Sequence, residues 1–158
     1  MPNLSFRPAK PSDRAFLYAV YASTRMEELA ITGWNQEQTA LFLEMQFSAQ
    51  HHHYQQVYQD AEFLIVLSDG LPIGRFYVAR WPKEIRIVDL ALLPEFRNKG
   101  YGATILKAIL SEASSDGKPV TLYVERLNPA LRLYQRLGFV KTGEQGIYDA
   151  MKWAESAR

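Results

Sequence analysis

The fold is decided by one stretch of the chain, Ile85-Arg86-Ile87-Val88-Asp89-Leu90-Ala91-Leu92-Leu93-Pro94-Glu95-Phe96-Arg97-Asn98-Lys99-Gly100-Tyr101-Gly102. Its apolar first part predicts a strand over residues 85–93, which Pro94 ends because proline has no N–H to donate to a sheet. Beyond the glycines, apolar side chains recur at the spacing of one helix face: Tyr101, Ile105, Leu106, Ile109, Leu110 and Ala113. A strand that passes through a glycine loop into a helix is typical of a mixed α/β fold.

Further strands and helices are predicted on both sides of this stretch. The predicted strands cover residues 4–7, 63–67, 73–80, 85–93, 120–124, 139–141 and 147–153. Helices are predicted from the capping residues Ser12, Asn35 and Asn128 onward, and from Tyr101 after the loop. The helix that follows Asn35 is expected to bury Phe42, Met45 and Tyr54. The predicted order is β-α-α-β-β-β-α-β-α-β-β.

The composition is typical of a folded soluble protein and excludes several classes of function. With 158 residues, 47% of them hydrophobic and 22% charged, the chain suits one domain over residues 1–158. A net charge of +1 gives no broad field for nucleic acid, and the absence of cysteine excludes a catalytic thiol and thiolate metal sites. The longest apolar run, Phe16–Ala22, is far shorter than the ~20 residues of a membrane span, and no signal peptide pattern is visible. We therefore expect a cytoplasmic protein with no membrane partner.

Three consecutive histidines, His51-His52-His53, raise the question of a metal site. Neighbouring positions on a helix point about 100° apart, so three adjacent imidazoles cannot converge on one ion. We expect a surface cluster and no metal.

The loop Arg97–Gly102 has the chemistry of an anion site. A helix N-terminus carries unpaired N–H groups and partial positive charge, and glycines let an anion approach these groups. Arg97 and Lys99 would add charge at the rim. The spacing is neither that of a Walker loop nor that of a dinucleotide loop. A plain strand-to-helix turn therefore remains the alternative.

Two blocks of sequence resemble the GNAT superfamily of acyl-CoA-dependent N-acetyltransferases. The first is Val88–Gly102, which is similar to that family's fourth strand and diphosphate loop (Arg/Gln-x-x-Gly-x-Gly/Ala). The second is Asn128-Pro129-Ala130-Leu131-Arg132-Leu133-Tyr134-Gln135-Arg136-Leu137-Gly138-Phe139. The resemblance covers residues 62–153, and the preceding residues match in layout alone. It implies a mixed, mostly antiparallel sheet of six to seven strands flanked by about four helices.

The resemblance also implies a site for acetyl-CoA as co-substrate. The backbone of Leu90, Ala91 and Leu92 would pair with the pantetheine arm as an added strand does. The diphosphate would be bound by the loop and first helical turn, through Arg97, Asn98, Lys99, Gly100, Tyr101, Gly102 and Thr104. Asn128 would contact the pantetheine, or would serve as a helix cap and nothing more.

The chemistry implied by the resemblance is direct acetyl transfer from acetyl-CoA to a primary amine without a metal. Tyr134 corresponds to the general acid that protonates the departing thiolate, although its position among leucines also suits an ordinary core aromatic. The general base is open, because Arg86 lies where some members have a glutamate. Asp89 is one candidate, with a structural role as its alternative, and so are a water chain and the carboxylates Glu28, Glu62, Glu84 and Glu125.

The acceptor is expected to be a small-molecule or peptide amine, contacted by the first two helices and the closing hairpin, and a homodimer is compatible with this fold. Two alternatives are a non-catalytic acyl-CoA-binding sensor on the same fold and a partner-binding module that uses the end of its sheet.

Overall fold

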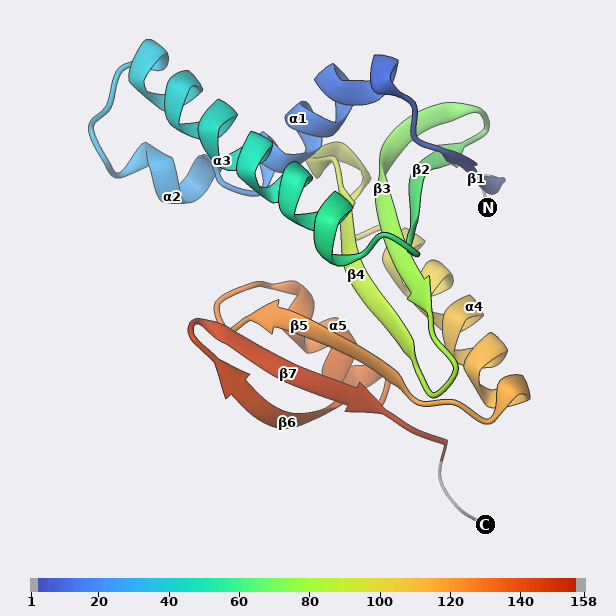
Figure 1. Cartoon of the computed structure of the whole chain (residues 1–158). Coiled ribbons are helices and arrows are strands. Elements are labelled where there is room, and N and C mark those ends of the chain that lie inside the picture. Colours follow the sequence, from blue (N-terminus) through green and yellow to red (C-terminus); the bar gives the residue numbers. More distant parts are fainter. Residues whose placement is uncertain (1–2, 156–158) are drawn as a thin grey trace. The chain divides into compact units, whose positions relative to one another are not determined.

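The computed structural model describes residues 3–155, which form seven strands and five α-helices (Figure 1). The strands are β1 (Leu4–Pro8), β2 (Glu62–Ser68), β3 (Leu71–Arg80), β4 (Ile85–Leu92), β5 (Val120–Glu125), β6 (Val140–Gln145) and β7 (Tyr148–Trp153). The helices are α1 (Arg14–Ser23), α2 (Met26–Ala30), α3 (Gln36–Val57), α4 (Tyr101–Asp116) and α5 (Ala130–Arg136), with short 3-10 turns at Pro11–Asp13 and Pro94–Phe96.

The strands form one sheet in the order β1-β2-β3-β4-β5-β7-β6. β1 pairs with β2, β5 with β7 and β6 with β7 in antiparallel register. β4 and β5 are parallel, as expected of strands that a helix connects. The predicted fold, a mixed and mostly antiparallel sheet flanked by helices, is confirmed.

The chain divides into two compact units, and β3 and β4 each have residues in both. Unit 1 comprises residues 3–76 and 90–97, and unit 2 comprises residues 77–89 and 98–155. In unit 1, α1 and α3 lie side by side (Figure 1), where the Phe47 ring meets those of Tyr18 and Tyr21. In unit 2, the predicted apolar face of α4 is buried: Tyr101, Ile105, Leu106, Ile109, Leu110 and Ala113.

The predicted cap of the first helix, Ser12, is wrong. Asp13, not Ser12, precedes α1, and its carboxylate binds the guanidinium of Arg7 at 2.8 Å. The helix stops at Ser23 and a separate α2 follows. Two hydroxyls mark this stop, since Ser23 donates to the Val20 carbonyl and Thr24 to the Tyr21 carbonyl, both at 2.7 Å. Side chains that compete for helix carbonyls in this way favour a helix end.

The cap of α3 is confirmed, and Phe42 and Tyr54 of its predicted inner face are half-buried, but the prediction for Met45 is wrong. Asn35 accepts a hydrogen bond from the Gln38 N–H at 2.8 Å, as a helix cap does. Leu43 and Phe47 are buried, whereas Met45 is 65% exposed. The buried face is therefore rotated from the expected one, because Tyr18 and Tyr21 of α1 meet Phe47.

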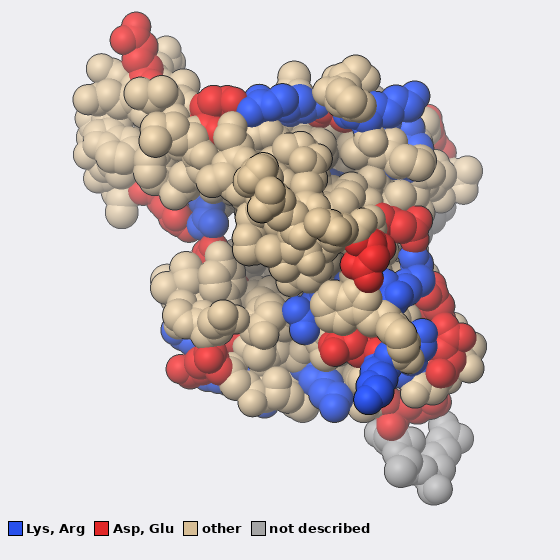
Figure 2. Space-filling model, viewed as in Figure 1, with Lys and Arg blue, Asp and Glu red and all other residues tan. Residues whose placement is uncertain are grey.

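Charged side chains of both signs are interspersed on the face that Figure 2 shows. Within residues 3–155, no helix combines the length and the apolar character that crossing a membrane requires.

Candidate active site

The loop before α4 has the backbone shape that an anion site needs. Asn98 and Gly100 have positive φ angles of 59° and 87°, and Gly100 directly precedes the first residue of the helix. Glycine adopts this left-handed conformation without strain, and asparagine tolerates it better than most residues. Asn98, Lys99 and Gly100 are all exposed. The chain thus turns sharply and leaves the start of α4 open to solvent.

The N–H groups at this helix start have little to bond to within the protein. The first helical hydrogen bond is donated by the Thr104 N–H to the Gly100 carbonyl at 3.0 Å. Among the described residues, no acceptor is found for the N–H groups of Asn98, Gly100, Gly102 and Ala103. Four unsatisfied donors at the positive end of a helix dipole suit a negatively charged group.

Thr104 lies one turn inside α4, at the edge of this group of donors. Its hydroxyl donates to the Gly100 carbonyl at 2.9 Å. The hydroxyl oxygen keeps its acceptor capacity, but its proton is engaged. In this conformation, the Thr104 hydroxyl ties the first turn of α4 to Gly100.

In unit 1, the end of β4 carries Leu90, Ala91 and Leu92, the residues expected to meet the pantetheine. Gly74 of β3 lies against them: a Cβ added to Gly74 would stand 2.3 Å from the Ala91 carbonyl oxygen and 3.0 Å from the Leu92 Cα. Both neighbours are backbone atoms, so a side chain at this position would displace β4. Gly74 therefore sets the course of the strand at Ala91 and Leu92.

Replacing Gly74 with alanine is expected to lower the melting temperature by roughly 5 °C, since overpacking costs about 1–3 kcal/mol. It should also weaken CoA binding about tenfold in calorimetry, because the displaced strand carries the expected pantetheine contacts. Gly143→Ala is the matched control, since nothing lies within 4 Å of a Cβ at this other strand glycine. Unchanged CoA affinity in Gly74→Ala would contradict this role.

Arg97 belongs to unit 1 and points back toward the strand. Its Nε donates to the Leu92 carbonyl at 2.9 Å, and a terminal nitrogen donates to the Ser23 hydroxyl at 3.0 Å. The side chain is half-buried. Two of its donors are thus used inside the protein.

In unit 2, Tyr134 of α5 is buried, with 6% of its surface exposed, and its ring meets that of Phe139 at 5.6 Å. Burial raises the pKa of the Tyr134 phenol well above its usual range, and the negative charge of Asp89 raises it further. Within the described part of unit 2, the Tyr134 hydroxyl makes no hydrogen bond. The group is therefore a protonated donor at neutral pH.

The turn before α5 explains how Tyr134 is held. Asn128 accepts a hydrogen bond from the Ala130 N–H at 2.9 Å, which is the capping role foreseen as one alternative. After the helix, Gly138 has a positive φ of 101°, and the Phe139 N–H donates to the Tyr134 carbonyl at 3.0 Å. This is a left-handed helix stop of the kind that glycine favours.

Arg86 of β4 is fixed by its neighbours in unit 2. Its guanidinium lies over the Trp81 ring at 5.2 Å and the Tyr123 ring at 5.0 Å, and its Nε donates to the Thr121 hydroxyl at 2.8 Å. A cation held between two rings has no role as a base. Arg86, considered from the sequence as the position of a possible glutamate base, is thus a structural arginine in this chain.

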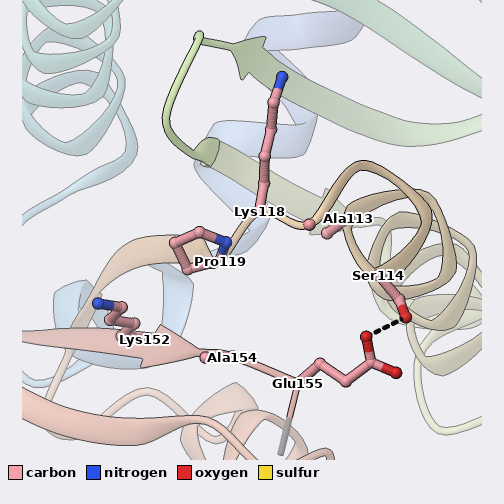
Figure 3. A pocket seen from close by; sticks show the side chains of 8 residues that line it. Ala113, Ser114, Lys118, Pro119, Lys152, Ala154 and Glu155 are labelled. Atoms are coloured by element: carbon pink, nitrogen blue, oxygen red, sulfur yellow. Dashed lines mark hydrogen bonds between the residues drawn. The ribbon is translucent and has the colours of Figure 1, made fainter. Parts of the chain in front are cut away.

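Two hollows lie elsewhere. The larger, of about 400 Å³, is lined in unit 2 by residues at the C-terminal end of α4 and by Lys152, Ala154 and Glu155. Its two lysines, Lys118 and Lys152, extend in different directions, and Glu155 bonds to Ser114 (Figure 3). The second, of about 350 Å³ in unit 1, is mainly apolar and is lined by Trp34, Gln38, Leu41, Phe42 and Met45. Neither includes a residue of the loop before α4.

The histidine run is not a uniform surface cluster. His52 and His53 are exposed, whereas His51 is half-buried and stacks on Phe47 at 5.5 Å. No group of potential metal ligands occurs within residues 3–155.

Two residues of this region, Gly74 and Ser23, were not identified from the sequence. A glycine inside an apolar strand indicates a close backbone approach, so the signal for Gly74 was present. Ser23 gave no signal, because its contact with Arg97 is made only in the folded chain.

Comparisons with known proteins bear on the family and the fold of this chain. Residues 16–139 match the acetyltransferase (GNAT) family. The chain is similar to an uncharacterized N-acetyltransferase, CgeE, of Bacillus subtilis (strain 168), with 32% identity over 69 residues. The matched segment covers 43% of this chain and 27% of that relative.

Solved structures share the fold at low sequence identity. The PaiA N-acetyltransferase of Thermoplasma acidophilum, in complex with coenzyme A, has a TM-score of 0.71 and 21% identity, covering 97% of this chain and 99% of that chain. A GNAT family acetyltransferase of Elizabethkingia anophelis with acetyl-CoA bound has a TM-score of 0.60 and 17% identity, with coverage of 97% and 99%. Because the family match spans most of the chain and the fold agrees throughout, this protein belongs to the GNAT acetyltransferase family.

Proposed function

We propose that this protein is a single-domain N-acetyltransferase that moves the acetyl group of acetyl-CoA to a primary amine by direct attack. Membership of the family indicates acyl transfer in general. The similar structures that contain CoA or acetyl-CoA support acetyl-CoA as the donor. The observation that carries the proposal is the set of N–H groups of Asn98, Gly100, Gly102 and Ala103, which have no acceptor among the described residues.

The residues present fit the diphosphate of CoA. The loop offers backbone donors at a helix N-terminus, and glycine at position 100 keeps a Cβ away from the anion. Lys99 is exposed beside these donors and adds positive charge. The acetyl-CoA thioester supplies the activated acyl group.

The pantetheine arm is proposed to pair with the backbone of Leu90, Ala91 and Leu92. The register of β4 with β5 joins Ile85–Ile87 to Val120–Leu122, whereas β5 itself continues to Glu125. A strand that loses its neighbour has backbone groups to offer to an extended ligand. The side-chain oxygen of Asn128 accepts the capping hydrogen bond, so Asn128 would contact the pantetheine arm through its side-chain NH2 group.

The protein supplies a proton donor for the departing thiolate. The amine nitrogen forms a bond to the acetyl carbon as the carbon–sulfur bond breaks, and the Tyr134 phenol gives its proton to the sulfur. The proton lost by the amine goes to a base, for which we propose Asp89 or a water chain. Asp89 lies near enough to raise the pKa of Tyr134, so the two groups act in one electrostatic environment.

The test is a panel of amines that covers amino acids, polyamines, aminoglycosides and peptide N-termini, assayed by release of the free CoA thiol from acetyl-CoA. We expect at least one class to give thiol release that depends on both amine and protein. CoA binding in calorimetry with no turnover on any amine would favour a non-catalytic sensor. Absence of CoA binding would contradict the proposed function.

A further inference from the structure

Arg97 connects two elements of unit 1 that are distant in the sequence. It donates to the Leu92 carbonyl at the end of β4 and to the Ser23 hydroxyl at the end of α1. Among the described residues, Arg97 forms no ion pair with a carboxylate. Its charge therefore acts on the backbone of a strand and on a helix end.

The end of α1 is well suited to hold this guanidinium. Ser23 donates its own proton to the Val20 carbonyl at 2.7 Å, so its oxygen is oriented to accept from Arg97. The C-terminal end of a helix carries partial negative charge, which favours a cation at this place. The contact is thus both a hydrogen bond and a charge–dipole interaction.

The end of β4 is restrained from two further sides. The Leu93 N–H donates to the Ile73 carbonyl at 2.9 Å. Gly74, next along β3, lies so close to β4 that a Cβ there would stand 2.3 Å from the Ala91 carbonyl oxygen. Because the Leu92 carbonyl also accepts a hydrogen bond from Arg97, the backbone of β4 is held in place at Ala91 and Leu92.

We infer that Arg97 is a positioning residue, which fixes the end of β4 by tying Leu92 to Ser23, and that it does not act as a charge on the diphosphate. The inference rests on the proposed function, because Leu92 is a proposed pantetheine contact. It replaces the expectation that Arg97 adds charge at the rim of the loop. The planar guanidinium is needed, since a lysine ammonium cannot reach two acceptors in this fork geometry.

The test is a double-mutant cycle between Ser23 and Arg97, with the dissociation constant for CoA measured by calorimetry. Arg97→Gln should weaken CoA binding about tenfold, and Ser23→Ala about threefold. Ser23→Ala should add no further loss in the Arg97→Gln background, because the bond is already absent. Arg97→Lys should bind CoA as poorly as Arg97→Gln, despite its charge.

Thr24→Ala is the matched control. Thr24 also donates to a carbonyl in the last turn of α1, at 2.7 Å, but the hydrogen bonds of Arg97 go to Leu92 and Ser23. The Ser23→Ala and Thr24→Ala proteins should lose similar amounts of thermal stability, while only Ser23→Ala changes CoA affinity. This separates positioning of the site from a general loss of structure.

One outcome would overturn the inference. If Arg97→Lys binds CoA as the original protein does and Ser23→Ala has no effect, Arg97 acts through its charge. If Arg97→Gln does not fold, the CoA affinities of Arg97→Lys and Ser23→Ala are sufficient to test the inference. Failure of the original protein to bind CoA would contradict the proposed function itself, which distinguishes the two failures.

Discussion

Replacing Tyr134 with phenylalanine is expected to lower kcat for acetyl transfer about 100-fold or more, while the dissociation constant for CoA stays within about twofold. The substitution removes one oxygen from a buried side chain and leaves the ring contact with Phe139 in place. The proton for the departing thiolate would then have to come from water. Steady-state kinetics with the best amine of the panel provide the measurement.

The pH dependence of kcat is a second test of the role of Tyr134. Because the pKa of Tyr134 is raised above its usual range, its protonated form persists through pH 10, and kcat should show no fall from phenol ionisation up to that point. Tyr123→Phe is the control, since Tyr123 is an exposed tyrosine of unit 2. Unchanged kcat in Tyr134→Phe would leave Tyr134 with a packing role alone.

Replacing Gly100 with valine is expected to weaken CoA binding about 100-fold, since two or more hydrogen bonds to a charged group would be lost. Gly100 has a φ of 87°, which a β-branched residue adopts only with strain. The loop would rearrange, and the valine methyl groups would stand where the anion approaches the N–H groups. Calorimetry with CoA gives the dissociation constant.

Gly117→Val is the matched control for this substitution. Gly117 is at the other end of α4, also has a positive φ of 66°, and has nothing within 4 Å of an added Cβ. Both variants should lose thermal stability through backbone strain, but Gly117→Val should keep its CoA affinity. Equal losses of affinity in the two variants would indicate that strain, and not the loop, is responsible.

Much of the fold could be predicted from the sequence, because the deciding signals are local. The apolar run of residues 85–93 and the stripe on α4 each match one element. The errors occur where contacts between residues that are distant in the sequence determine the local structure. Asp13 precedes α1 because it binds Arg7, and Met45 is exposed because Phe47 takes the inner face against α1.

The candidate site could be predicted in its backbone but not in its side chains. Gly100 and the helix start were visible as a glycine loop before an apolar stripe. The direction of Arg97 could not be foreseen, since its acceptors are a carbonyl of β4 and a hydroxyl of α1, which meet only after folding. The capping bond of Asn128 was foreseen as an alternative, and its contact with pantetheine remains a proposal.

The most direct measurement is an amide NMR titration of the protein with CoA, followed at Asn98, Gly100, Gly102 and Ala103. Without ligand, these amide protons should exchange rapidly with water, because no acceptor in the described chain protects them. On addition of CoA they should shift strongly downfield and become protected. If they are already protected without ligand, or if CoA binds and leaves them unchanged, the diphosphate is held elsewhere and the account is wrong.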